Sequence, residues 1–247
     1  MKVVFYEFAY IYRYKFNAIM MYVLIGIMGY GFVKGIGSLT HNTTPLVLAY
    51  LLWSFYQSTA NSVGWSFMSF AEQGTLERIF SVSRSPLSIS LIYIISALPQ
   101  GFIDILYLYL VFYFLKVSPG IKYLSYLLIT FVSLSPFFVG LALVFVGLFF
   151  LMKRAGIVVE LVNSILVGAG IFSIGHFSHY IEKIINFVPY TYAARILFNM
   201  FESGKTGDLL LTQVRLFAIS TIYFFIGVLV LNLCYDRARK EGTLGHY

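Results

Sequence analysis

Long stretches of this sequence contain no Asp, Glu, Lys or Arg, and this pattern limits the folds that the chain can adopt. The charge-free stretches include residues 16–33, 42–71, 85–103, 123–152 and 216–235. A helix needs about 20 apolar residues to cross about 30 Å of hydrocarbon, and each stretch is long enough or nearly so. Membrane β-barrels also cross bilayers, but their strands alternate polar and apolar residues. These stretches do not alternate, so they predict an all-α integral membrane protein.

The composition agrees with this prediction. Of the 247 residues, 60% are hydrophobic and 11% are charged, whereas a soluble domain carries about 25% charge. The formal net charge of +7 could indicate a nucleic-acid partner. However, the Lys and Arg residues lie at the ends of the apolar stretches, where membrane proteins face anionic lipid. We therefore expect contact with membrane lipid and not with nucleic acid.

The chain divides into an N-terminal segment and one transmembrane domain. Residues 1–16 have apolar side chains at helical spacing among charged ones, which predicts an interfacial amphipathic helix. Residues 17–247 would form the single transmembrane domain. Its six predicted spans are about residues 17–33, 46–69, 87–115, 124–151, 156–174 and 216–234. Residues 34–45 would be a loop, and a basic tail would follow the last span.

Two segments between spans have their own character. Residues 71–85 are polar, and Thr75 can cap a short helix with Leu76, Ile79 and Phe80 on one face. Residues 175–215 are too polar for a span and too apolar for an ordinary loop. Short helices that re-enter the outer leaflet would reconcile these properties.

The Lys and Arg residues also predict orientation. With both termini inside, ten of them face the cytoplasm: Lys2, Arg13, Lys15, Arg78, Arg84, Lys153, Arg154, Arg237, Arg239 and Lys240. The two short outer loops hold Lys34, Lys116 and Lys122. The long outer segment adds Lys183, Arg195, Lys205 and Arg215, but long segments weigh less in this rule. The bias predicts that both termini lie in the cytoplasm, and we expect a multi-pass protein of the plasma membrane.

Polar residues within the spans are candidates for function. Asp104 is an acid deep in the third span, where it could form a proton or cation site or be a hydrogen-bonded structural acid. Tyr56, Asn61 and Trp65 fall roughly on one face of the second span. Asn163 and Ser164 lie on a small, polar side of the fifth. For these residues of the second and fifth spans, helix–helix packing through small and polar groups is the alternative explanation.

The sequence contains no pattern for catalysis or for a metal site. Residues 203–206, SGKT, lack the earlier glycine of a phosphate loop, because Asn199 occupies its position and no strand precedes it. His176 and His179 have no evident third ligand. We therefore expect neither an ATP site nor a metal site in this chain.

Three motifs in order, taken with the predicted topology, resemble the ABC-2-type permease family. They are EQGTLE at residues 72–77, VPYTYA at 188–193 and RKEGTLG at 239–245. An interfacial helix, an inward polar helix after the second span and a re-entrant outer segment after the fifth are similar to this family too. The resemblance covers nearly the whole chain.

The resemblance implies a permease subunit of an ATP-driven exporter. Two permease copies, as a homodimer or a heterodimer, would pair with separate ABC ATPase subunits, which bind ATP and Mg²⁺ while this chain binds no cofactor. The coupling helix would be residues 71–85, with a second contact at residues 153–154. The coupling residues would be Glu72, Gly74, Thr75, Leu76, Glu77, Arg78, Ile79, Phe80, Arg84, Lys153 and Arg154. An ordinary solvated loop is the alternative for residues 71–85.

The resemblance also implies that the second and fifth spans line the transport pathway. On this basis the candidate substrate-facing residues are Tyr56, Asn61, Trp65, Asn163 and Ser164. Members of the family export drugs, lipids and polysaccharides, and we expect a hydrophobic or amphipathic small molecule here, with a lipid-linked glycan second. A gradient-driven secondary transporter or channel, or a membrane scaffold without transport, are the alternatives.

Overall fold

The computed structural model describes residues 15–40, 44–75, 79–80, 85–117, 120, 123–152, 155–172, 187–203 and 209–241. The described residues form helices, and no strand occurs among them. Among the described residues, three helices are long and apolar enough to cross a membrane, namely Pro86–Phe114, Leu124–Leu151 and Leu210–Glu241. This agrees with the prediction of an all-α chain with membrane-spanning helices. The predicted interfacial helix lies outside the described residues apart from residues 15 and 16, which begin the first long helix.

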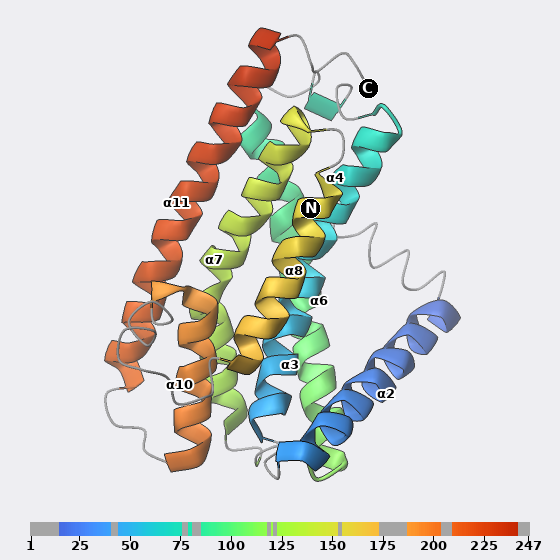
Figure 1. Ribbon diagram of the computed structural model, residues 1–247, viewed down its shortest axis with the longest axis vertical. Coiled ribbons are helices and arrows are strands. Elements are labelled where there is room, and N and C mark those ends of the chain that lie inside the picture. Colours follow the sequence, from blue (N-terminus) through green and yellow to red (C-terminus); the bar gives the residue numbers. More distant parts are fainter. Residues whose placement is uncertain are drawn as a thin grey trace.

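Helices α7 (Leu124–Leu151) and α11 (Leu209–Glu241) share the most extensive contact of the bundle, and they run side by side along most of its length (Figure 1). Two glycines make this contact possible. A Cβ atom on Gly140 would lie 2.8 Å from the Cα atom of Phe224, and one on Gly227 would lie 2.7 Å from the Cα atom of Gly140. The two backbones therefore touch, as they do where small residues line helix interfaces in membranes.

A continuous helix from Thr44 to Glu72 runs the length of the bundle, made of α3 (Thr44–Tyr56), a π-helical turn η1 (Gln57–Asn61) and α4 (Ser62–Glu72). It ends in a left-handed cap at Gly74, whose φ is 66°. The N–H groups of Gly74 and Thr75 donate to the last carbonyl groups of the helix, at 3.1 and 3.0 Å. This is a Schellman motif, which needs a residue such as glycine at positive φ.

Helix α6 (Pro86–Phe114) returns in the opposite direction. Pro86 occupies its first turn, where the missing N–H has no cost. At the other end Lys116 adopts a φ of 56° and the N–H of Val117 donates to the carbonyl oxygen of Phe112 at 2.9 Å. The same type of cap thus ends α6, here with lysine in the left-handed position.

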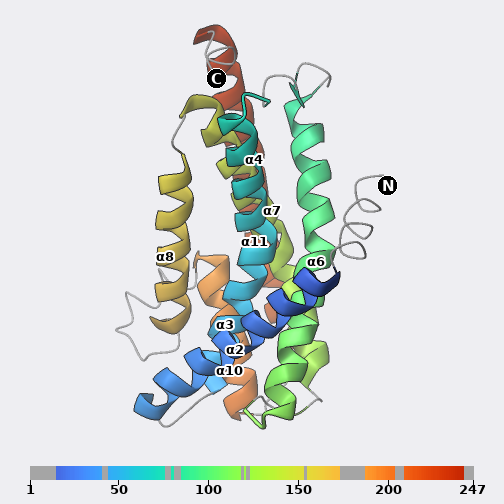
Figure 2. The same ribbon diagram turned by 90° about the vertical axis from the view of Figure 1, so that its right-hand side faces the viewer.

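Helix α2 (Lys15–Thr40) lies obliquely to the other helices, and its N-terminal end diverges from them (Figures 1 and 2). It meets the bundle at Gly29, where a Cβ atom would lie 2.7 Å from the ring of Tyr50. Most of its apolar side chains are exposed, including Phe16, Ile19, Leu24, Ile27 and Met28. The prediction of a loop from residue 34 was wrong, because Lys34 is an exposed residue within this helix and a single lysine does not end one.

Helices α8 (Gly156–Phe172) and α10 (Pro189–Ser203) complete the bundle. Helix α10 packs against α3, α7, α8 and α11 in the half of the bundle far from the α11 C-terminus, and buries Tyr190, Ala193, Ala194 and Leu197. Residues 175–186 and 204–208 of the predicted re-entrant segment lie outside the described residues. The predicted end of this segment at residue 215 was wrong, because α11 begins at Leu209.

Candidate functional site

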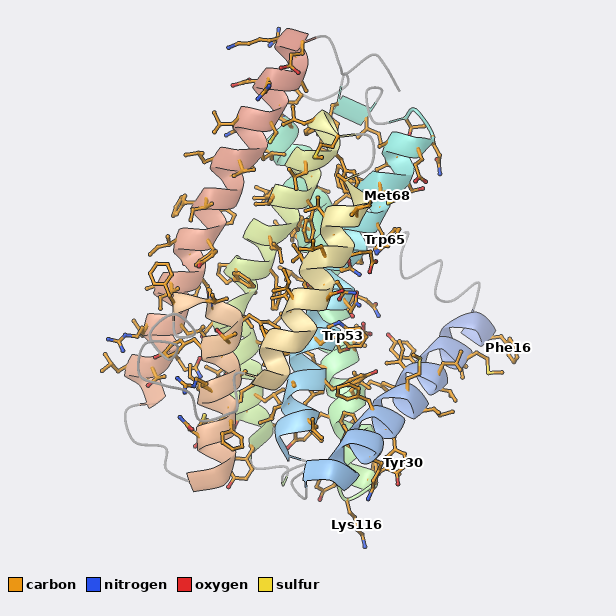
Figure 3. The ribbon with its side chains drawn as sticks, in the orientation of Figure 1. Phe16, Tyr30, Trp53, Trp65, Met68 and Lys116 are labelled. Atoms are coloured by element: carbon orange, nitrogen blue, oxygen red, sulfur yellow. The ribbon has the colours of Figure 1, made fainter. Side chains whose placement is uncertain are left out.

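A cavity of about 720 Å³ lies between α2, the helix from Thr44 to Glu72 and α6. Its walls are mainly apolar and aromatic, with a smaller number of polar side chains. Trp53 and Trp65 lie one above the other along the same helix, on the side of the bundle where α2 lies (Figure 3). The lining residues of the central helix are Ala49, Tyr50, Trp53, Ser54, Gln57, Ser58, Asn61, Ser62 and Trp65; α2 adds Ile25, Met28 and Phe32, and α6 adds Ala97, Gln100 and Asp104.

The π-helical turn explains how one helix lines the cavity over four turns. In an α-helix, residues spaced by four drift by about 40° around the axis at each step. The turn at Gln57–Asn61 contains an extra residue, and this offsets the drift. Two rows of side chains spaced by four therefore stay on the face that lines the cavity. One row is Tyr50, Ser54, Ser58 and Ser62, and the other is Trp53, Gln57, Asn61 and Trp65.

Serine and threonine side chains support the backbone through this turn. The Ser58 hydroxyl lies 3.0 Å from the carbonyl oxygen of Ser54, and the Ser62 hydroxyl lies 2.8 and 2.9 Å from those of Ser58 and Thr59. Such bonds satisfy carbonyl groups inside a helix, and they bend helices in membranes. The hydroxyl residues of this stretch thus stabilise the local geometry that forms the cavity wall.

Asp104 lies on the α6 wall of the cavity, buried, with 8% of its surface exposed. Its Oδ1 atom accepts hydrogen bonds from the Tyr22 hydroxyl at 3.0 Å and from Gln100 Nε2 at 2.8 Å. Its Oδ2 atom accepts one from the Ser58 hydroxyl. Gln100 Nε2 also lies 2.6 Å from the Tyr22 hydroxyl. Three helices therefore meet at one carboxyl group, through partners that are all neutral donors.

A second polar network lies behind the Trp53 wall. The Oδ1 atom of Asn163, on α8, accepts hydrogen bonds from Trp53 Nε1 at 2.9 Å and from Gln57 Nε2 at 3.2 Å. Asn61 Nδ2 donates to Gln57 Oε1. Asn163 is half-buried and does not line the cavity itself. Its side chain holds the Trp53 indole and the Gln57 amide, which do line the cavity, and it connects α8 to the central helix.

Replacing Asn163 by leucine should destabilise the protein by about 1–3 kcal/mol, because Trp53 Nε1 and Gln57 Nε2 would lose their acceptor. The matched control is Ser164→Ala, since the exposed Ser164 hydroxyl bonds only to its own helix, at Glu160 O. The melting temperature can be followed by labelling Cys234, the one cysteine, which is buried in the fold. Equal melting temperatures for the two variants would contradict the role of Asn163.

The structure places the predicted pathway residues in four different environments. Asn61 and Trp65 line the cavity, and Asn163 lies one layer behind it. Tyr56 does not line the cavity: its side chain is fully buried and its ring lies 6.1 Å from that of Phe138 on α7. Ser164 is exposed on α8, away from the cavity.

The polar segment between α4 and α6 is described only in part. Leu76, Glu77, Arg78, Arg84 and the contact at residues 153–154 lie outside the described residues. Of the rest, Glu72 is exposed at the end of α4 and Gly74 forms its cap; Thr75 bonds back to Phe70 O through its hydroxyl, at 3.2 Å, and Ile79 is half-buried.

Phe80 fixes this segment to the bundle. The Phe80 ring is buried, with centroids 4.8 Å from Phe150 on α7, 6.1 Å from Phe67 on α4 and 6.5 Å from Tyr235 on α11. The N–H of Ile79 donates to Thr75 O at 3.0 Å, which forms a helical turn. Phe80 therefore packs against the chain's own helices, with 5% of its surface exposed.

Sequence reasoning missed the residues that surround Asp104. Gln100 and Asp104 are four apart, a spacing that places both on one face of α6 and could have indicated a polar pair. The serines at 54, 58, 62 and 66 show the same spacing of four. Nothing in the sequence pointed to Tyr22, which reaches Asp104 only because α2 crosses α6.

The site is thus a cavity within apolar helices, with a buried carboxyl group on one wall, aromatic rings on another and a polar segment beyond one end. The resemblance to ABC-2-type permeases remains a prediction based on the three sequence motifs. The chain matches no family model, no curated protein and no solved structure.

Proposed function

We propose that this chain is the membrane-spanning permease subunit of an ATP-driven ABC exporter. It would act as a dimer with separate ATPase subunits and move a hydrophobic or amphipathic molecule out of the cytoplasm. The long helices α2, the Thr44–Glu72 helix, α6, α7, α8 and α11 would be its six spans. Both termini would lie in the cytoplasm, where the segment between α4 and α6 would meet the ATPase.

One observation supports this proposal more than any other: the polar segment joins the two helices that hold most of the polar groups of the cavity. It begins after Glu72, at the end of the helix that carries Asn61 and Trp65, and ends at Pro86, at the start of the helix that carries Asp104. A displacement of this segment would therefore move two walls of the cavity. This is the mechanical link that an exporter driven by a partner ATPase requires.

The anchoring of Phe80 adds to this argument. Because its ring contacts α4, α7 and α11, a force on the segment would also reach the tight pair formed by α7 and α11. Helices that are packed backbone to backbone move together, since interiors of this kind are close-packed and transmit strain.

The ends of the bundle fit the proposed orientation. Glu72, Arg237, Arg239 and Lys240 lie at the end of the bundle where α11 terminates, and this end would face the cytoplasm. Lys116 lies at the opposite end (Figure 3). The other basic residues assigned to this end, Arg78, Arg84, Lys153 and Arg154, lie outside the described residues, so the proposed orientation rests on the Lys and Arg count in the sequence.

The second candidate function is a gradient-driven transporter. Asp104 favours it, since a buried acid within a membrane helix can carry a proton or a cation. The two functions differ in their need for a partner, because a gradient-driven transporter works without an ATPase subunit.

The proposal predicts that Glu77→Ala or Arg78→Ala will lower the ATPase activity of the assembled complex at least tenfold without unfolding the permease. The tagged chain would be purified from its native membrane with the proteins that bind it, and ATP hydrolysis measured. Lys116→Ala, an exposed change at the opposite end, is the control and should leave the activity unchanged. Recovery of a folded chain without any ATPase, or full activity in the two variants, would contradict the proposed function.

A further inference from the structure

The cavity has the size and lining of a site for a drug-sized organic molecule. Its volume of about 720 Å³ falls within the range of about 300–1,000 Å³ that is usual for such sites. Aromatic rings of Phe32, Tyr50, Trp53 and Trp65 form much of its surface, with Met28 beside them. A flexible methionine and flat rings allow ligands of different shapes to pack.

The charge of the cavity is unusual. Asp104 is the one ionisable carboxyl group among the lining residues, and none of them is Lys, Arg or His. Asp104 accepts hydrogen bonds from the hydroxyl groups of Tyr22 and Ser58 and from the amide of Gln100. Each of these groups can donate to a carboxylate, but none carries a positive charge that would neutralise it. Charges at membrane depth are normally paired. Within the described residues, the cavity lacks a positive counterpart.

The aromatic walls favour the same kind of ligand. A cation over the face of tryptophan is attracted by the ring, more strongly than over tyrosine or phenylalanine. Trp53 is held in place by Asn163 and by the Tyr50 ring, whose centroid lies 5.4 Å away. Trp65 is 43% exposed, so part of its ring is open to a ligand.

We propose that the cavity binds lipophilic organic cations, with the positive charge near Asp104 and the apolar groups against the rings of Trp53 and Trp65. A single positive charge would supply the counterpart that Asp104 lacks. Such cations would then be the exporter's substrates. Their role as substrates rests on the proposed function, whereas their binding to the cavity does not.

The two tryptophans make the test direct. They are the only tryptophans of the chain and both line the cavity, so fluorescence excited selectively from tryptophan, and not from the 20 tyrosines, reports on the cavity. The purified full-length chain would be titrated in detergent with tetraphenylphosphonium, a permanent lipophilic cation. Tetraphenylborate, an anion of the same shape, would be titrated separately. Asp104→Asn removes the charge and keeps an acceptor; the control Asp236→Asn removes an exposed charge on α11.

We expect Asp104→Asn to weaken the binding of tetraphenylphosphonium at least tenfold and to leave tetraphenylborate no weaker, while Asp236→Asn changes neither. An unchanged affinity for the cation in folded Asp104→Asn would overturn the proposal. A second variant, Trp65→Leu, changes a partly exposed ring and should weaken cation binding about two- to fivefold, followed through Trp53. Should Asp104→Asn fail to fold, an unchanged affinity in Trp65→Leu would overturn the proposal instead.

These outcomes are separate from those of the ATPase experiment. Cation binding by a chain that recovers no ATPase would support the ligand class and reject the exporter. A coupled ATPase without Asp104-dependent cation binding would support the exporter and reject the ligand class.

Discussion

Replacing Gly140 by leucine is expected to prevent the bundle from assembling. A Cβ atom at this position would lie 2.8 Å from the Cα atom of Phe224 and closer still to the carbonyl oxygen of Tyr223. Because these atoms belong to the backbone of α11, no rotamer change can relieve the clash. The two helices would have to separate along the most extensive interface of the protein. The expected result is loss of the monodisperse folded species in size-exclusion chromatography.

Smaller changes should give a graded effect. Gly140→Ala should cost about 1–3 kcal/mol or more, as overpacked cores do. Gly147→Ala should cost less, because its Cβ atom would lie 3.1 Å from the Cα atom of Leu231. Gly31→Ala is the matched control: nothing lies within 4 Å of its Cβ position, and alanine favours the helix. Similar melting temperatures for Gly140→Ala and Gly31→Ala, measured through Cys234, would contradict the backbone contact.

Phe80→Ala should both destabilise the protein and disconnect the polar segment from the bundle. Truncation of a buried phenylalanine costs about 3–5 kcal/mol, through lost burial and the space left behind. Phe80 is 5% exposed and contacts rings on three helices, so its loss would leave such a space beneath the segment. Under the proposed function, ATPase activity of the complex should also fall, by tenfold or more.

The comparison with an exposed phenylalanine separates the two effects. Phe114, at the end of α6, is 77% exposed, and Phe114→Ala should change neither stability nor coupling. Phe80→Leu keeps most of the packing and should restore most of the stability. A Phe80→Ala variant that melts at the wild-type temperature would contradict the conclusion that this ring anchors the segment to the bundle.

Helix positions could be predicted where local residues determine the ends. Helix α7 covers the predicted residues 124–151, and α6 begins at Pro86, one residue before the predicted start. The proline and the glycine-type caps act through the backbone of their own helix, so the sequence carries their signal. Most of the predicted short helix at Thr75 lies outside the described residues, and the hydrogen bond from the Ile79 N–H to Thr75 O is what the structure describes there.

The ends of α2 and α11 were predicted wrongly for a common reason. The start of the predicted loop at residue 34, the end of the predicted outer segment at residue 215 and the start of the predicted tail after residue 234 all lie inside helices, because α2 continues to Thr40 and α11 covers Leu209–Glu241. A charged residue limits how far a helix extends into hydrocarbon, but it is compatible with helix continuing into water. Charge patterns therefore predict apolar segments better than they predict helix boundaries.

The cavity could not be predicted from sequence because it depends on relations between helices. Its polar residues in the central helix were visible, and Asn61 and Trp65 were among the candidates. Tyr56 was grouped with them wrongly, because at about 100° per residue it lies about 140° from Asn61 and about 180° from Trp65 even in a regular helix, whereas Trp53 and Gln57 share the spacing of four with Asn61 and Trp65. The sequence of this turn, QSTAN, has no property that distinguishes it from an α-helical turn. The oblique path of α2, which brings Tyr22 to Asp104, likewise has no local signal.

The length of α11 has a consequence for any protein that binds at its C-terminal end. With 33 residues the helix is about 50 Å long, some 20 Å more than the hydrocarbon core of a bilayer requires. Its last turns hold Arg237, Arg239 and Lys240 on a continuous helix, and Arg237 pairs with Glu241 at 2.7 Å. A partner would meet these charges already ordered, so little conformational entropy would be lost on association. The last turns of α11, up to Glu241, would therefore form a rigid binding surface.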